Sequence, residues 1–327
     1  MCLNMRLGRR TAMALAVVIL AMAAANAGAQ QVLQQRDIEE GYIQVTGGKV
    51  WYRIVGAKQP GIPVLALHGG PGFPSDYLEP LEGLADERPV IFYDQLGCGR
   101  SDLPTENSLW TMERFLEEIE FVRQALKLNK IHIIGQSWGA MLGMEYVLGK
   151  PEGVVSLVSS GSAHDGPRWE ADQQIHLNNM PPELKSIILR NQEAGTTSSA
   201  EYLVAMQVYY QRHVCRLDPL PNSLKRSQAS MGIPYLYMFG PSEFYCTGTL
   251  KGFEQTSRMP NVTIPVLFTA GEFDEARPET VKWFQSITPG SEVVIFANAS
   301  HDHHLEVTEE YLKVVRDFLK RKETKNP

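Results

Sequence analysis

The chain has 327 residues, of which 43% are hydrophobic and 21% are charged, and its formal net charge at pH 7 is −6. This acidic balance argues against a nucleic acid or an anionic membrane as partner, because both are bound through clusters of Lys and Arg. The composition is that of an ordinary globular enzyme without repeats, and the length suffices for one large domain or for a core with an inserted cap.

Residues 1–29 have the three parts of a secretory signal peptide. Arginines precede an uncharged apolar run, Thr11–Ala25, and Ala27-Gly28-Ala29 then offers the small residues that signal peptidases cut. The run is too short for a stable membrane anchor. We therefore expect an exported protein, periplasmic or secreted, and Arg9-Arg10 leaves a twin-arginine route open beside the general secretory one.

After the signal peptide, short apolar runs that end in polar or glycine-rich turns predict strands. Tyr42–Val45 and Val50–Val55 flank Gly47-Gly48, which is a hairpin pattern. Further strands are expected at 63–67, 89–93, 131–134 and 154–159, with an amphipathic helix at 112–126. Continuous apolar strands separated by helices indicate an α/β fold whose mostly parallel sheet is covered by helices on both faces.

The pattern changes between residues 162 and 260. This stretch is rich in Gln, Asn, Met and Tyr, and Pro181-Pro182 and Pro219-Leu220-Pro221 break it into short helices. Strands are expected again at 265–270 and 292–297, before a closing helix near 309–320. We therefore predict an α/β core of residues 30–161 and 261–327, interrupted by a mainly helical cap of residues 162–260.

Gly135-Gln136-Ser137-Trp138-Gly139 matches the Gly-x-Ser-x-Gly pattern of a nucleophile elbow. The apolar run Ile131–Ile134 precedes it and the helical run Ala140–Leu148 follows it, which is the strand–turn–helix context of an α/β-hydrolase fold. The turn is tight enough to need a glycine on either side, and it exposes the serine hydroxyl at the edge of the sheet. Ser137 is thus the predicted nucleophile.

A serine nucleophile needs a general base and an acid that orients it. In this fold they follow in the order Ser, Asp or Glu, His, each after a strand. Asp274 follows the strand at 265–270 and His301 follows the strand at 292–297. We therefore predict Asp274 as the acid and His301 as the base. Other residues of the same two loops compete for these roles, namely Glu272, Glu275, His303 and His304.

His68-Gly69-Gly70-Pro71-Gly72 follows the third strand, where such enzymes place one donor of the oxyanion hole. Its glycines let the backbone approach a substrate carbonyl closely. The helix N-terminus after the elbow supplies N–H groups as well. The predicted oxyanion donors are the backbone N–H groups of Gly70 and Trp138.

Cys98, Cys215 and Cys246 are the cysteines that follow the signal peptide. No Cys/His spacing is typical of a zinc site, so we predict neither a metal nor a cofactor. Cys215 and Cys246 lie in the same segment. A disulfide between them, formed in an oxidising compartment, and a pair of free buried thiols are both open alternatives.

Four segments together resemble the proline iminopeptidases (prolyl aminopeptidases), namely His68–Gly72, Tyr93–Ser101, Gly135–Gly139 and Gly271–Glu275. The resemblance runs from about Gly41 to Leu319. Members of that family cleave an unblocked N-terminal residue, usually proline, from short peptides. The resemblance therefore implies an exported serine exopeptidase that acts on a short peptide or an amino-acid amide through an acyl-enzyme.

The same resemblance assigns two carboxylates to substrate binding. Gly240-Pro241-Ser242-Glu243-Phe244 is similar to a Gly-Pro-Asn-Glu-Phe segment of the family, with Ser in place of Asn. Family members hold the substrate ammonium with carboxylates, which carries over onto Glu243 in the cap and Glu275 beside the predicted acid. Paired carboxylates in a partly dry pocket suit this role because they attract a cationic amino terminus strongly.

Two alternative functions stay open. An amino-acid amidase or a carboxylesterase would use the same serine chemistry on the same fold, so the fold does not decide between them and an aminopeptidase. A non-catalytic binding protein on this scaffold is disfavoured because all three predicted triad positions and both oxyanion elements are present. The oligomeric state is not predicted.

Overall fold

The computed structural model describes residues 37–323. Nearly all of the described residues belong to one compact unit that begins at Glu39. The predicted signal peptide, residues 1–29, lies outside the described residues. Within 37–323 no helix combines the length and the apolar content that crossing a bilayer takes.

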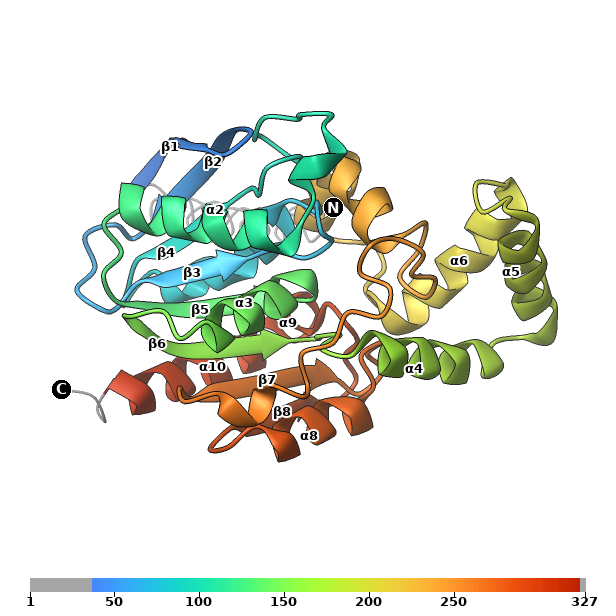
Figure 1. The fold of residues 1–327 in the computed structure, drawn as a ribbon. Coiled ribbons are helices and arrows are strands. Elements are labelled where there is room, and N and C mark those ends of the chain that lie inside the picture. The colour runs from blue at the N-terminus through green and yellow to red at the C-terminus, as the bar shows by residue number, and fades with distance from the viewer. Residues whose placement is uncertain (1–36, 324–327) are drawn as a thin grey trace, which may run out of the picture. The chain divides into compact units, whose positions relative to one another are not determined.

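The described residues form one eight-stranded sheet (Figure 1). Its spatial order is β1-β2-β4-β3-β5-β6-β7-β8. The strand β2 pairs antiparallel with β4, and every pair from β4 to β8 is parallel. The strands are β1 (Ile38–Val45), β2 (Gly48–Val55), β3 (Val64–Leu67), β4 (Val90–Tyr93), β5 (Ile131–Gln136), β6 (Val154–Ser160), β7 (Val266–Gly271) and β8 (Glu292–Phe296). The mostly parallel α/β sheet that the sequence predicts is therefore confirmed.

Both faces of the sheet are buried, which explains the unbroken apolar runs. In β3, Leu65 and Leu67 point to one apolar cluster while Val64 and Ala66 point to the other, as alternation along a strand requires. The first cluster includes α2 (Met112–Ala125), α3 (Trp138–Leu148) and α8 (Pro278–Ile287). The second includes the 3₁₀ segment η1 (Ser75–Leu84) and α10 (Thr308–Glu323).

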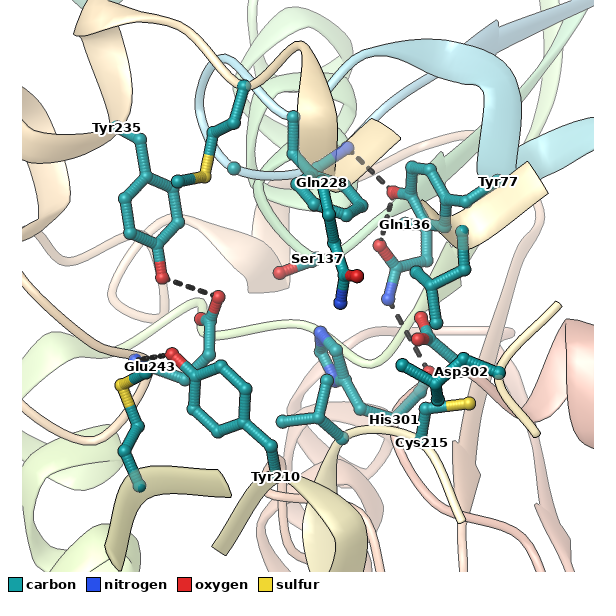
Figure 2. Close-up of a pocket in the computed structure, with 18 of the residues that line it drawn as sticks. Tyr77, Gln136, Ser137, Tyr210, Cys215, Gln228, Tyr235, Glu243, His301 and Asp302 are labelled. Carbon is teal, nitrogen blue, oxygen red and sulfur yellow. Dashed lines mark hydrogen bonds between the residues drawn. The ribbon is translucent and has the colours of Figure 1, made fainter. Parts of the chain in front are cut away.

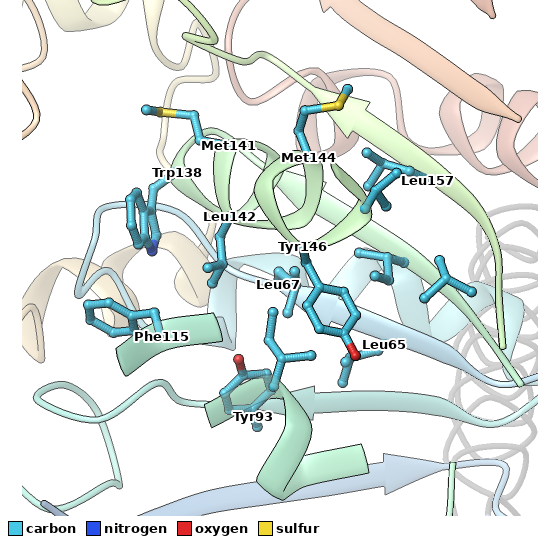
Figure 3. Packing of buried hydrophobic residues seen from close by; sticks show 14 of the residues in the cluster. Leu65, Leu67, Tyr93, Phe115, Trp138, Met141, Leu142, Met144, Tyr146 and Leu157 are labelled. Carbon is cyan, nitrogen blue, oxygen red and sulfur yellow. The ribbon is translucent and has the colours of Figure 1, made fainter. Parts of the chain in front are cut away.

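Helix α3, which follows the predicted nucleophile, is held on the sheet by close packing. Figure 3 shows Leu142 and Tyr146 of α3 directed toward Leu65 and Leu67 of β3. Phe115 of α2 packs edge-to-face against Trp138, with 5.4 Å between the ring centroids. Each buried apolar side chain of this size contributes roughly 1.5–3 kcal/mol. The first turn of α3 is therefore fixed relative to the strands.

The segment between β6 and β7 holds most of the remaining helices. Figure 1 shows α4, α5 and α6 extending away from the edge of the sheet at which β6 ends. They share an apolar cluster of their own that includes Leu177, Ile188, Tyr202 and Tyr209. The helices are α4 (Gly166–Asn178), α5 (Pro182–Ala194), α6 (Ala200–His213), α7 (Asn222–Ala229) and the short η3 (Tyr235–Phe239).

We call residues 162–260 the cap segment. It belongs to the same compact unit as the sheet, so the division into core and cap at these boundaries stays a prediction. Short single-turn elements complete the fold, namely η2 (Asn107–Leu109), η4 (Met259–Asn261) and α9 (His303–Glu306).

Candidate active site

Ser137 occupies the turn between β5 and α3. Its backbone has φ 55° and ψ −121°, a conformation that costs a non-glycine residue about 1–3 kcal/mol. A Cβ atom on Gly135 would lie 2.2 Å from the carbonyl oxygen of Gly139, and one on Gly139 would lie 2.0 Å from the carbonyl oxygen of Leu67. Both flanking glycines are therefore required for the turn to close, as the motif predicts.

The turn presents Ser137 to a cavity of about 200 Å³ (Figure 2). The side chain is half-buried, and Gly70 lines the same cavity. The adjacent loop approaches closely, since a Cβ on Gly69 would lie 3.2 Å from Cβ of Ser137. Trp138 begins α3, where backbone N–H groups have no acceptor within the helix. Of the two predicted oxyanion donors, Gly70 thus lines the same cavity as Ser137, and Trp138 directly follows Ser137 in the chain.

Asp274 and His301 meet in the loops that follow β7 and β8. Nδ1 of His301 lies 2.8 Å from Oδ1 of Asp274. Asp274 is fully buried and accepts hydrogen bonds from the backbone N–H groups of Gly271 (3.2 Å) and Ala276 (2.8 Å). These donors fix the carboxylate, which in turn holds the imidazole with Nε2 free to face the cavity.

Nε2 of His301 lies 3.5 Å from Oε1 of Glu275, and it makes no hydrogen bond with Ser137 in this conformation of the described residues. Burial lowers the pKa of His301, but the carboxylates of Asp274 and Glu275 more than offset this and raise it to about 10. Catalysis needs the neutral imidazole. The free enzyme is therefore biased toward the protonated, inactive form of its base.

Of the competing loop residues, Glu272, His303 and His304 lie away from the cavity. Glu272 is exposed and accepts a hydrogen bond from the backbone N–H of Asn298. His303 is buried against Thr269, and His304 against the backbone carbonyl of Tyr77. Burial lowers the pKa of both histidines, to about 4 and about 3. Neither lines the cavity, so His301 is the histidine of these loops that faces Ser137.

Glu243 enters the cavity from the cap segment. Figure 2 shows it between Tyr235 and Tyr210. Oε1 accepts a hydrogen bond from the hydroxyl of Tyr235 at 2.6 Å, and the backbone N–H of Glu243 donates to the hydroxyl of Tyr210 at 3.2 Å. Burial raises the pKa of Glu243, while Tyr235 and His301 oppose the rise. The carboxylate is thus aimed into the cavity by aromatic side chains.

Glu275 is fully buried, and neither of its carboxylate oxygens has a hydrogen-bond partner. Burial and the nearby carboxylates of Glu243 and Asp274 hold its pKa well above the usual range. A buried carboxylate without a hydrogen bond is costly unless a cation or a donor lies beside it, and the protonated His301, 3.5 Å away, is such a cation in the free enzyme. Glu243 therefore lines the cavity, whereas Glu275 lies behind the lining and acts on the site through its charge.

Asp302, which no sequence pattern singles out, also lines this cavity. The residue is 3% exposed, and Oδ2 has no hydrogen-bond partner. Tyr210 and Tyr235 likewise stand out in the sequence only through the abundance of Tyr in the cap segment. An aspartate directly after a loop histidine carries no signal in the sequence that separates it from a solvated loop charge.

The cap segment is bonded directly to both catalytic loops. The backbone carbonyl of His213 accepts hydrogen bonds from the N–H groups of Glu275 (3.3 Å) and His301 (3.1 Å). The next carbonyl, that of Val214, accepts from the N–H of Asp302 at 2.8 Å. The end of α6 therefore bridges the acid loop and the histidine loop.

The cavity lining has a distinct composition. Among the described residues that line it none is Lys or Arg, and apolar side chains form much of the wall, namely Phe73, Met206, Val214, Leu220, Leu224 and Met231. Residues 37–323 hold no group of three or more metal-ligating side chains. Cys98, Cys215 and Cys246 are free thiols, so the structure contains no disulfide between Cys215 and Cys246.

The chain is similar to characterised sequences over most of its length. A family model described as the alpha/beta hydrolase fold matches residues 62–307. A proline iminopeptidase of Heyndrickxia coagulans is 43% identical over 282 residues, which cover 86% of this chain and 98% of the relative. A proline iminopeptidase of Saccharolobus solfataricus is 34% identical over 287 residues, with coverage of 86% and 93%.

Solved structures give the same picture. The crystal structure of a proline iminopeptidase from Mycobacterium smegmatis matches with a TM-score of 0.83 at 35% identity, and covers 88% of this chain and 100% of its own. The crystal structure of VinJ matches with a TM-score of 0.84 at 32% identity, with coverage of 86% and 98%. A thermophilic esterase from Thermogutta terrifontis, at 19% identity and a TM-score of 0.63, shares the fold alone.

Proposed function

Since the chain belongs to the proline iminopeptidase family of α/β hydrolases, we propose that it is a serine aminopeptidase that releases an unblocked N-terminal proline from short peptides. The observation that carries this proposal is a pair of carboxylates: Glu243 lines the cavity, in which no described lining residue is Lys or Arg, and the fully buried Glu275 lies behind the lining, 3.5 Å from Nε2 of His301. A substrate with a free ammonium group supplies the missing charge.

In this mechanism Ser137 attacks the carbonyl carbon of the first residue and His301 accepts the hydroxyl proton through Nε2. Asp274 keeps Nδ1 protonated and stabilises the imidazolium that forms. The N–H groups of Gly70 and Trp138 donate to the oxyanion of the tetrahedral intermediate. The protonated His301 then gives its proton to the leaving amine. In the second half of the reaction His301 takes a proton from water, which attacks the acyl-enzyme, and then returns that proton to Ser137 as the first residue is released.

The free amino terminus has a second role in this proposal. Glu275 lies against the nitrogen of His301 that must act as base. An ammonium group held between Glu243 and Glu275 compensates the negative charge that raises the pKa of His301, and so favours the neutral imidazole. Binding of the correct substrate thereby helps to activate its own general base.

The walls of the cavity suit a small apolar first residue. Tyr210 and Tyr235 stand beside Glu243, so the ring that carries the ammonium contacts aromatic faces while its nitrogen reaches the carboxylate (Figure 2). A pyrrolidine ring is rigid and small, and it loses little conformational freedom on entering such a pocket. Such a pocket favours proline over a long, flexible first residue.

The experiment that tests the proposal compares three substrates: proline anilide, N-acetyl-proline anilide and a simple acyl ester of similar size. We expect acetylation to lower kcat/KM by a factor of about 100 or more, because it removes the charge that both glutamates require. Equal rates on the blocked and unblocked anilides would refute aminopeptidase specificity. Faster turnover of the ester than of either anilide would favour the carboxylesterase alternative.

We also propose that the enzyme acts outside the cytoplasm, after removal of residues 1–29. The support is the sequence pattern of the N-terminus alone. N-terminal sequencing of the protein recovered from the periplasm or the medium tests this proposal. A mature chain that begins near Gln30 is the expected result, and full-length protein confined to the cytosol would contradict it.

A further inference from the structure

Asp302 is the one acidic residue of the cavity lining that the mechanism above does not use. The residue is 3% exposed and its Oδ2 has no hydrogen-bond partner, yet it lines the same cavity as Ser137 and His301. A buried carboxylate oxygen that is left unsatisfied costs free energy in the free enzyme. Such a group is expected to meet a donor or a cation when the site fills.

The position of Asp302 indicates which part of a substrate it meets. In Figure 2, Glu243 lies on one side of Ser137, and Asp302 lies on the opposite side with Cys215. A peptide whose ammonium group is held near Glu243 has its scissile carbonyl at Ser137. The second residue of the peptide therefore extends toward Asp302.

The surroundings of Asp302 favour a positive charge. The cap contributes Val214, Leu220 and Leu224 to the cavity wall, which exclude water, and no Lys or Arg is among the described residues that line it. Burial, and the carboxylates of Glu306, Asp274 and Glu243, raise the pKa of Asp302 to about 8, although His301 opposes the rise. A cation placed beside Asp302 lowers this pKa and favours the charged carboxylate, whereas a second carboxylate raises the pKa further.

From this geometry we propose that Asp302 forms a leaving-group subsite that selects peptides whose second residue carries a positive charge. The inference rests on the proposed function, because it places the first residue by its ammonium group at Glu243. It assigns to Asp302 a specificity role that is separate from recognition of the amino terminus. The preferred substrates are thereby peptides that begin with proline followed by Lys or Arg.

The test uses the full-length enzyme and three dipeptide amides, Pro-Lys-NH2, Pro-Leu-NH2 and Pro-Glu-NH2. The amide removes the C-terminal charge, so the three substrates differ in charge only at the second side chain. For the wild type we expect kcat/KM to be about tenfold higher for the lysine than for the leucine peptide, and lowest for the glutamate peptide. Asp302→Asn should reduce the lysine-to-leucine ratio at least fivefold, and Asp302→Glu should retain most of it.

Asp317→Asn provides the matched control. Asp317 is exposed on α10, outside the residues that line the cavity, so this variant removes the same charge without touching the site. Its lysine-to-leucine ratio should equal that of the wild type. A shift as large as that of Asp302→Asn would show that only the overall charge of the protein matters, and would overturn the proposal.

The other outcomes of this test also support or overturn the proposal. A wild-type lysine-to-leucine ratio near one overturns the inference whether or not the variants fold. If Asp302→Asn lowers kcat/KM by the same factor on all three peptides, Asp302 positions His301 and does not select the leaving group. If the wild type cleaves proline anilide but ignores the charge of the second residue, this inference alone fails. If it cleaves no unblocked substrate, the proposed function fails with it.

Discussion

Oε1 of Glu275 lies 3.5 Å from Nε2 of His301, the ring nitrogen that must accept the proton of Ser137. In the free enzyme this contact favours an imidazolium, which cannot act as a base. The carboxylate that recognises the substrate in our proposal is therefore also the group that restrains the catalytic histidine. This relationship connects substrate recognition with the protonation state of the base.

The first prediction concerns the pH dependence of labelling of Ser137 by a fluorophosphonate. Because the pKa of His301 is raised to about 10, the labelling rate of the free enzyme should increase with pH through the alkaline range. Glu275→Gln removes one of the charges that raise this pKa, so the midpoint should move down by about one pH unit or more. Labelling measured from pH 6 to 11 checks both statements.

A pH profile of turnover by the wild type complements the labelling experiment. The pH profile of kcat on proline anilide reports the enzyme–substrate complex, in which the ammonium group compensates Glu275. Its lower midpoint should therefore lie below that of labelling. Identical midpoints would show that the substrate amine does not act on His301.

Ser137→Ala should abolish turnover while the protein stays folded. Removing the nucleophile of a serine triad lowers kcat by roughly 10⁴-fold or more. The side chain is half-buried, and the contacts that hold the turn are made by the backbone, including the hydrogen bond from its N–H to the carbonyl of Ser160. We expect the free energy of unfolding to change by less than about 1 kcal/mol. Retention of more than about 1% of the activity would refute Ser137 as the nucleophile.

Gly139→Ala tests the geometry of the elbow. Its Cβ would meet the carbonyl oxygen of Leu67 at 2.0 Å, and neither group can move because β3 and α3 are buried. We expect a loss of about 3 kcal/mol or more in the free energy of unfolding, or insoluble protein. Urea unfolding measures the loss.

Gly195→Ala is the control for this substitution. Gly195 has φ 67°, but a Cβ added to it would have no heavy atom within 4 Å, so only the backbone conformation is strained. We expect a cost of about 1–2 kcal/mol. An equal effect of the two substitutions would show that close packing at the elbow contributes nothing.

The burial of His164 leads us to predict that the folded protein loses stability in acid. Burial lowers its pKa from 6.5 to about 4, so between these values the unfolded chain binds a proton that the folded chain does not. The stability that His164 contributes is therefore lost as the pH falls from 6.5 toward 4, by up to about 3 kcal/mol. His164→Gln should flatten the dependence of the unfolding free energy on pH in this window. Between pH 7 and 9 the unfolding free energies of the wild type and of His164→Gln should change with pH at the same rate.

Much of the site follows from local sequence. The apolar strand β5, two glycines and the helical run that follows predict the elbow at Ser137, because few other turns need a glycine on both sides of a serine. Asp274 and His301 follow from their places after β7 and β8, and the structure brings their side chains within 2.8 Å. These predictions succeed because each depends on a strand and the loop directly after it.

Other parts depend on contacts between distant segments, which the sequence does not reveal. Glu243 is predicted only through a family resemblance, and its neighbours Tyr210 and Tyr235 come from different elements of the cap segment. The position of Glu275 against His301 depends on where the cap bonds to both loops. Asp302 is not predicted because its burial is created by the cap.

Two elements of the core are also not predicted. The 3₁₀ segment η1 has Pro80 in its middle and lacks the spacing of an α-helix. Helix α8 begins with Pro278 at its first position, a helix-start signal that the sequence does contain. Its buried side chains Val281 and Phe284 are three residues apart, but the helix is short and carries few such pairs.

The carbonyl groups of His213 and Val214 have a consequence for how this enzyme can diversify. They bond to the backbone of Glu275, His301 and Asp302, so the cap is part of the scaffold that assembles the triad. Exchanging the cap with that of a related hydrolase, as a means of changing specificity, would transfer this scaffold too. A chimera stays active only if the incoming segment presents two successive carbonyls at the same place. A change of specificity through the cap therefore has to preserve the contacts that position the catalytic loops.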